Sequence, residues 1–137
     1  DVGRGDFVGT HIADIAQEKV YEAGKVVFQE NEMGDVLYII KSGAVQIYKV
    51  LGTGQEKTLA VLHTQAFFGE MSLLDDSPRS ASARAAQDST LLAVDKESFK
   101  EVVNEYPEIA FEIFKVFSQR LREANKEIQS LSEKSNV

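Results

Sequence analysis

The residues best suited to hold a ligand lie in one stretch, Phe68 to Ala83, which reads FGEMSLLDDSPRSASA. Gly69 lets the backbone approach a ligand closely, and the amides that open the following turn are free donors, a combination that suits a phosphate. Arg79 adds a permanent cation with a fork-shaped set of donors. Glu70 is out of place beside an anion unless it accepts hydrogen bonds from a neutral part of the same ligand, such as a sugar hydroxyl. A phosphate and a hydroxyl together indicate a nucleotide.

Each of these residues also has a plainer interpretation. Arg79 could be a surface arginine paired with Asp75 or Asp76, an interaction that contributes only ~0–1 kcal/mol at an exposed site. Glu70 could simply favour the first turn of a helix, because acidic side chains are stabilised there. Ser80 could be tolerated at the start of a strand. The small residues from Ser80 to Ala83 favour the binding interpretation, because they leave room beside the arginine.

The stretch lies within a region that predicts short strands separated by glycine-containing turns. Strands this short and evenly spaced suit a compact antiparallel roll. In one of them Val45 and Ile47 alternate with Gln46 and Tyr48, the pattern of a strand buried on one face. The predicted strands are Val26–Phe28, Val36–Ile40, Val45–Tyr48, Leu59–Leu62, Ser80–Ala86 and Thr90–Val94.

After the strands the period changes to that of helices. Asp95 is a good N-cap for a first helix, and Pro107 ends it and can begin a second helix that runs to about Leu131. The second helix carries a heptad seam, which predicts pairing with a second copy of the chain. Folding of this seam back onto the chain's own roll is the alternative. The seam consists of Ala110, Phe114, Phe117, Leu121, Ala124, Ile128 and Leu131.

The stretch Phe68–Ala83 resembles the phosphate-binding cassette of cyclic nucleotide-binding domains, as found in catabolite-activator-like proteins, kinase regulatory subunits and cyclic nucleotide-gated channels. Upstream, YEAGKVVFQENEMGDVLYIIKSGAVQIY (Tyr21–Tyr48) resembles the opening strands of the family. Downstream, LLAVDKESFKEVVNEYP (Leu91–Pro107) resembles its last strand and first C-terminal helix. The resemblance implies a mainly β fold: an antiparallel, jelly-roll-like β-roll with a short helix in the cassette and two C-terminal helices.

The resemblance also implies roles for individual residues. Arg79 would pair with the exocyclic oxygens of a cyclic phosphate, and Glu70 would accept the ribose 2′-hydroxyl. Ser80 would be a second phosphate contact. Because relatives specific for the guanine nucleotide often carry threonine at that position, serine favours cAMP over cGMP. Gly69 and Met71 would offer backbone contacts.

Four further residues are expected to reach the ribose or the base. Ile47 and Leu59 would pack on them, although both also suit the ordinary core of the roll. In dimeric relatives the long helix covers the base. Leu121 would press against the base, and Asn125 of the partner copy would meet the adenine amino group, since an amide both donates and accepts. Exposure on the helix surface is an equally good interpretation of Asn125.

Composition excludes several other classes of protein. The 137-residue chain has no cysteine, so disulfides, thiolate metal sites and cysteine nucleophiles are excluded. Its two histidines, His11 and His63, are far apart and show no metal-ligand spacing. The net charge of −7 argues against direct contact with nucleic acid. No apolar run is long enough to span a membrane, and we expect a cytoplasmic protein.

We therefore expect one non-catalytic sensor domain that binds a cyclic nucleotide and passes occupancy through its C-terminal helices to an output module. Two alternatives remain: a degenerate domain that only dimerises, and an enzyme that holds a catalytic metal or small molecule in a cupin-like roll. The expected organisation is a linker at 1–10, the roll at 11–94, the hinge and lid or dimerisation helices at 95–131, and a frayed tail at 132–137.

Overall fold

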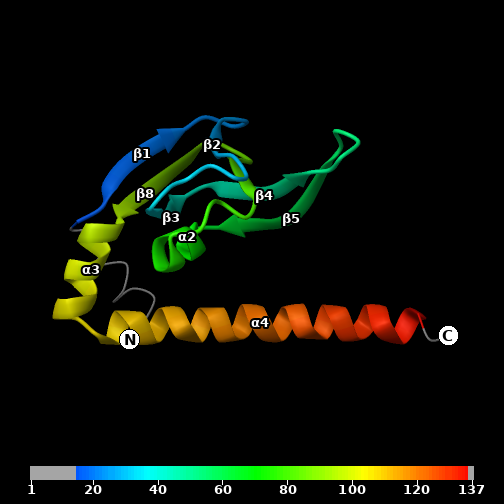
Figure 1. Cartoon of the computed structure of the whole chain (residues 1–137). Coiled ribbons are helices and arrows are strands. Elements are labelled where there is room, and N and C mark those ends of the chain that lie inside the picture. Colours follow the sequence, from blue (N-terminus) through cyan, green and yellow to red (C-terminus); the bar gives the residue numbers. More distant parts are fainter. Residues whose placement is uncertain (1–14, 136–137) are drawn as a thin grey trace.

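The computed structural model describes residues 15–135 as two four-stranded antiparallel sheets followed by helices (Figure 1). One sheet has the strand order β1-β8-β3-β6, and the other has the order β2-β7-β4-β5. The expected antiparallel roll with C-terminal helices is therefore confirmed. The strands are β1 (Gln17–Tyr21), β2 (Val26–Phe28), β3 (Val36–Ser42), β4 (Ala44–Val50), β5 (Glu56–His63), β6 (Phe67–Phe68), β7 (Ser82–Ala85) and β8 (Ser89–Asp95).

Strand β3 packs against the core of the roll on one face and against the helices on the other. Its run VLYII is buried on both faces, as a continuous apolar strand requires. Tyr38 and Ile40 pack into the core between the two sheets, with residues such as Phe28 and Phe68. Leu37 and Ile39 face the other way and pack against the helices. The cassette and the C-terminal helices are thus anchored on the back of the sheet that forms one wall of the roll.

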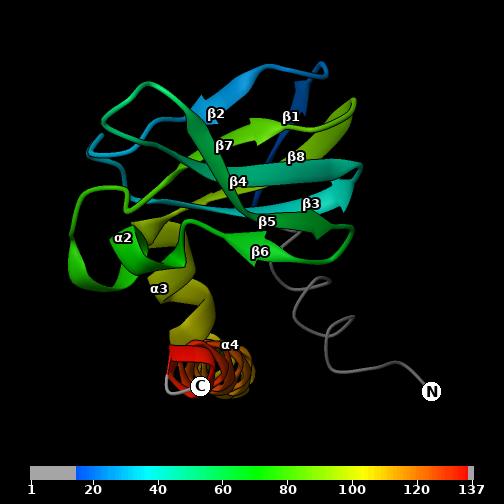
Figure 2. The same cartoon turned by 90° about the vertical axis from the view of Figure 1, so that its right-hand side faces the viewer.

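Three helices follow from the sequence as expected. The cassette helix α2 (Glu70–Asp75) is short and begins after Gly69, which has a left-handed conformation. Asp95 caps α3 (Lys96–Glu105) by accepting a hydrogen bond from the Ser98 amide at 2.8 Å. A sharp connection at Pro107 leads into α4 (Glu108–Ser135), which runs beneath the roll and past α2 (Figure 1). Figure 2 looks along the axis of α4 and shows that α3 connects this helix to the roll.

The long helix continues to Ser135, beyond the end predicted near Leu131. The frayed tail expected at 132–137 stays a prediction. Among the side chains of α4 that the structure describes, Ile109 and Ile113 of its first turns join the core beside the helices. The second half of α4 does not fold back along its seam, since Leu121 and Ile128 are exposed. The linker expected at 1–10 lies outside the described residues.

Two strands were not predicted, and one predicted pattern was wrong. The strand β1 is charged and lies at a sheet edge, paired with β8, so it lacks an apolar run. The strand β6 has two residues, too few for any periodicity. Tyr48, predicted to face solvent, is buried, because the Arg84 guanidinium of the neighbouring strand β7 covers its ring at 4.2 Å.

Candidate ligand-binding site

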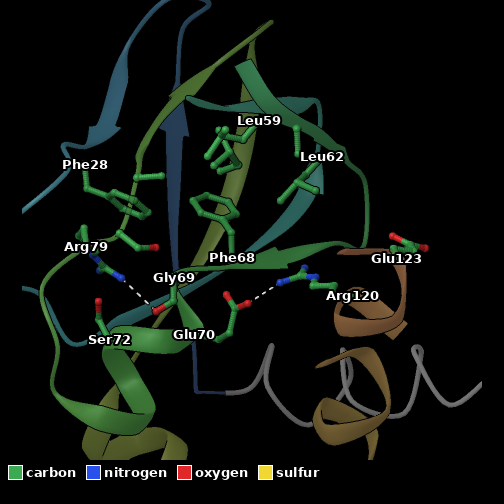
Figure 3. Close-up of a pocket in the computed structure, with 14 residues that line it drawn as sticks. Phe28, Leu59, Leu62, Phe68, Gly69, Glu70, Ser72, Arg79, Arg120 and Glu123 are labelled. Carbon is green, nitrogen blue, oxygen red and sulfur yellow. Dashed lines mark hydrogen bonds and ion pairs between the residues drawn. The ribbon is translucent and has the colours of Figure 1, made fainter. Parts of the chain in front are cut away.

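A cavity of about 450 Å³ opens between the cassette, the sheet containing β5, and α4 (Figure 3). This volume is within the range of small-molecule sites. Apolar side chains form most of its wall, and charged groups lie at its cassette end and along α4. The lining residues are Phe28, Ile47, Leu59, Ala60, Leu62, Phe68, Gly69, Glu70, Ser72, Arg79, Ser80, Ala81, Arg120 and Glu123.

Arg79 is a buried cation held without a carboxylate partner. The residue is only 4% exposed. One terminal nitrogen donates to the Gly69 carbonyl at 3.0 Å and the other to the Val36 carbonyl at 2.9 Å. Within the described part of the chain, no ion pair is formed by Arg79. Burial lowers the pKa of this guanidinium from its ordinary value, yet an arginine stays protonated in proteins, so the site keeps a positive charge.

The two aspartates that could have neutralised this arginine are engaged elsewhere. Asp75 accepts hydrogen bonds from the amide and hydroxyl of Ser77. Asp76 pairs with Lys96 at the start of α3. The surface-pair interpretation of Arg79 is therefore wrong, because both aspartates have other partners and Arg79 is buried.

Two glycines allow the backbone to close around the guanidinium. A Cβ atom at Gly34 would lie 2.9 Å from a terminal nitrogen of Arg79. A Cβ atom at Gly69 would lie 2.8 Å from the other terminal nitrogen and 3.0 Å from the Val36 carbonyl oxygen. Gly69 also has a φ of 84°, a conformation that glycine adopts without strain. Both positions therefore require glycine while the arginine occupies this place.

Glu70 opens α2 and is 7% exposed at the wall of the cavity. Its carboxylate forms an ion pair with Arg120 of α4 (Figure 3). Arg120 also donates to the Phe67 carbonyl at 2.8 Å and lies over the Phe67 ring at 5.0 Å. A carboxylate has about four acceptor sites, so Glu70 can keep this partner and still accept a hydroxyl from a ligand.

The cavity contains most, but not all, of the residues expected from the sequence. Gly69, Glu70, Arg79, Ser80, Ile47 and Leu59 all line it. Leu121 and Asn125 are exposed on α4 and do not line the cavity of this chain. Their predicted contacts with the base remain predictions that require a partner copy. Met71 lies on α2, and its predicted role concerns its backbone only.

Several lining residues were missed by sequence reasoning. Phe28 was predicted only as a strand residue and Phe68 only as the start of the cassette stretch, and their place in the wall depends on pairing between distant strands. Arg120 and Glu123 lie one helical turn apart on α4, so they share a face. That spacing was visible, but the face that meets the cassette depends on the angle of the Pro107 connection. No local signal specifies that angle.

Two other classes of site find no support in the described residues. Between residues 15 and 135, no group of three or more histidine, cysteine, aspartate or glutamate side chains is arranged to hold a metal ion. None of the described helices is long and apolar enough to cross a membrane.

Comparisons with known proteins agree with this geometry. A family model described as cyclic nucleotide-binding domain matches residues 18–106. The chain is 40% identical over 116 residues to the cyclic AMP receptor protein of Thermus thermophilus, a match that covers 85% of this chain and 54% of the relative. The chain spans about half the length of the curated relatives it matches.

Solved structures show the same likeness. The crystal structure of the Thermus thermophilus catabolite activator protein matches with a TM-score of 0.83 and 38% identity, covering 91% of this chain and 58% of that one. A structure of cAMP-bound PfPKA-R matches with a TM-score of 0.64 and 34% identity, over 72% of this chain and 34% of that one. Arg79 of the cassette is buried in the wall of the cavity, and the family model matches residues 18–106. This chain therefore belongs to the family of cyclic nucleotide-binding domains, which is a regulatory family.

Proposed function

We propose that this domain binds cAMP in the cavity and reports its occupancy through α4 to an attached output module, without catalysing a reaction. The observation that carries the proposal is the state of Arg79. A cation that is 4% exposed, with no carboxylate partner in the described residues, is costly unless an anion joins it. A phosphodiester carries one negative charge and oxygens that match the arginine fork.

The rest of the cavity suits the remainder of a cyclic nucleotide. Glu70 lies next to Gly69 and offers acceptors for a ribose hydroxyl. Ile47, Leu59 and Leu62 provide an apolar wall for a planar base. Ser80 lines the cavity beside Arg79, and by resemblance to the family, serine rather than threonine at this position favours cAMP over cGMP. The name of the Thermus relative and the ligand of the PfPKA-R structure support the same choice.

A direct contact connects the ligand site to α4. Glu70 contacts both the cavity and Arg120, so a ligand that binds Glu70 changes the environment of the pair that holds α4. A ligand shifts a conformational equilibrium by as much as its affinity differs between the states. We infer that cAMP favours the state in which α4 lies against the cassette, with the Pro107 connection as the hinge.

Titration calorimetry with cAMP and cGMP tests the proposal on the wild type, Arg79→Leu and Arg84→Leu. Arg84 is the matched control, because it is bound to Glu56 outside the cavity. We expect cAMP to bind more tightly than cGMP, Arg79→Leu to lose at least a hundredfold in affinity, and Arg84→Leu to bind as the wild type does. The proposal is wrong if neither nucleotide binds the wild type.

A second candidate is a domain that only dimerises. The exposed apolar residues Phe114, Leu121 and Ile128 on α4 favour a partner helix whether or not a ligand binds. This candidate predicts a stable dimer in sedimentation experiments and no heat on addition of either nucleotide. Binding of cAMP with dimer formation would support both the sensor and its pairing through α4.

A further inference from the structure

We propose that Phe28 is a positioning residue for the phosphate: its ring holds the guanidinium of Arg79 in place before any ligand binds. The inference rests on the proposed function, since it concerns how the same site achieves its affinity. The central guanidinium carbon of Arg79 lies 4.2 Å from the centroid of the Phe28 ring. Figure 3 shows the guanidinium near this ring at the cassette end of the cavity.

The backbone locks the two residues together. The Arg79 amide donates to the Glu32 carbonyl at 2.9 Å, and the Asn31 amide donates to the Arg79 carbonyl at 2.8 Å. The loop that follows β2 is therefore bonded in both directions to the residue that carries the guanidinium. Phe28 is the last residue of β2, so its ring cannot move far from Arg79 without breaking these bonds.

The ring is itself held by other aromatic side chains. Its centroid lies 5.8 Å from that of Phe68 and 5.9 Å from that of Tyr38. Phe68 and Tyr38 stack on each other at 5.3 Å, with an interplanar angle of 15°. All three rings are buried in the core between the sheets. This cluster makes the platform beneath the guanidinium rigid.

The edge of the guanidinium is held as firmly as its face. The carbonyls of Gly69 and Val36 accept two of its five N–H donors, which leaves three donors for a phosphate. A side chain fixed on both its face and its edge loses little conformational entropy when a ligand arrives. The fork is therefore preorganised.

The nature of the partner matters for an anion site. A carboxylate in the place of Phe28 would stabilise the buried cation but would repel the incoming phosphate. The face of an aromatic ring attracts a cation through its quadrupole and brings no net negative charge. Phe28 thus stabilises the empty site while leaving the full charge of Arg79 available to the ligand.

Fluorinated phenylalanine at position 28 tests this role, because fluorine weakens the negative face of the ring with little change in shape. We expect the Kd for cAMP to rise stepwise with 4-fluoro, 3,5-difluoro and 3,4,5-trifluoro rings, by about tenfold over the series, given the strength of desolvated cation–π contacts. The same series at Phe99 is the control, since that ring is buried in the core beside the helices, does not line the cavity and has no described cation over it. Urea unfolding checks that the stability of each variant is unchanged.

Two further measurements keep the test independent of the fluorinated series. Phe28→Leu keeps apolar bulk but removes the ring, and should weaken cAMP binding by about fivefold to thirtyfold. In the ligand-free wild type, the NMR signals of the Arg79 guanidinium should be shifted upfield by the ring, and this shift should vanish in Phe28→Leu. This shift reports whether the ring lies over the guanidinium in the empty site, and its absence in the wild type would overturn the preorganised contact.

The outcomes separate this inference from the proposed function. If the wild type binds cAMP and its Kd is flat across the Phe28 series, the positioning role is wrong while the sensor function stands. Equal slopes for the Phe28 and Phe99 series also overturn the positioning role. If the wild type binds no cAMP, both proposals fall together.

Discussion

Glu70 and Arg120 form an ion pair that connects the wall of the ligand cavity to the long C-terminal helix. The two residues are fifty positions apart, and their side chains are 10% and 35% exposed, respectively. Arg120 also binds the Phe67 carbonyl, so a single side chain of α4 contacts both the cassette helix and the strand before it. This pair is the direct contact through which the site and α4 can affect each other.

Removing the arginine should release α4. Arg120→Ala leaves Glu70 partly buried and unpaired, and we expect faster hydrogen exchange in α4. Because Arg120 acts on the ligand only through Glu70, cAMP binding should weaken by about threefold to tenfold, the net value of an ordinary hydrogen bond. Arg122→Ala is the matched control, because Arg122 is exposed on the same helix and does not line the cavity. Equal exchange rates in the two variants would argue against the pair as a tether.

Glu70 is expected to recognise the ribose. Glu70→Ala should weaken cAMP binding by about 10–100-fold, since a hydrogen bond to a charged acceptor contributes about 1.5–3 kcal/mol. Titration calorimetry with 2′-deoxy-cAMP separates this contact from the ion pair with Arg120. In the wild type the deoxy ligand should bind more weakly than cAMP, and in Glu70→Ala the two ligands should bind equally. Unchanged affinity for cAMP in the variant would exclude the contact.

Gly69 should tolerate no side chain. Gly69→Ala forces a Cβ atom against Arg79 and the Val36 carbonyl at a φ of 84°, so we expect a loss of about 1–2 kcal/mol in the free energy of unfolding. Displacement of the guanidinium should also weaken cAMP binding by about tenfold or more. Gly52→Ala is the control, because nothing lies within 4 Å of its added Cβ atom. Similar urea midpoints for the two variants would contradict the close fit.

Pairing through α4 is a separate prediction. Leu121 and Ile128 are 65% and 64% exposed and lie seven residues apart on the heptad seam. Leu121→Glu places a charge at the centre of the predicted interface and should shift sedimentation equilibrium toward the monomer. Gln119→Glu adds the same charge two residues away and should leave the association constant unchanged. A monomeric wild type would remove the basis for the contact predicted for Asn125 of the partner.

The cap of α3 predicts a pH dependence of stability. Hydrogen bonds from Ser98 lower the pKa of Asp95 below its ordinary value of 3.8. A carboxyl group whose pKa is lower in the folded state stabilises the fold above the unfolded value, and this contribution is lost as the pH falls through the folded pKa. The free energy of unfolding should therefore fall below about pH 4, and Asp95→Asn should flatten that part of the profile. An unchanged profile in this variant would contradict the assignment.

Much of the fold could be predicted because the signals are local. Short runs of apolar or small residues between turns marked six of the strands, Asp95 marked the start of α3, and Pro107 marked the junction with α4. In the cassette, the types and spacing of Gly69, Glu70 and Arg79 indicate a phosphate beside a hydroxyl, and the resemblance to the family adds the role of Ser80. The sequence by itself therefore determined the class of ligand site and the residues at its charged end.

The tertiary structure decided what surrounds those residues. Phe28 reaches Arg79 because β2 pairs with β7, and Arg120 reaches Glu70 because α4 turns beneath the cassette. Leu121 and Asn125 lie away from the cavity for the same reason, since they occupy another face of α4. The types of the site residues determine which ligand groups they can bind. The partner of each charge depends on strand pairing and on the angle between helices, which arise from packing over long distances in the chain and leave no local pattern.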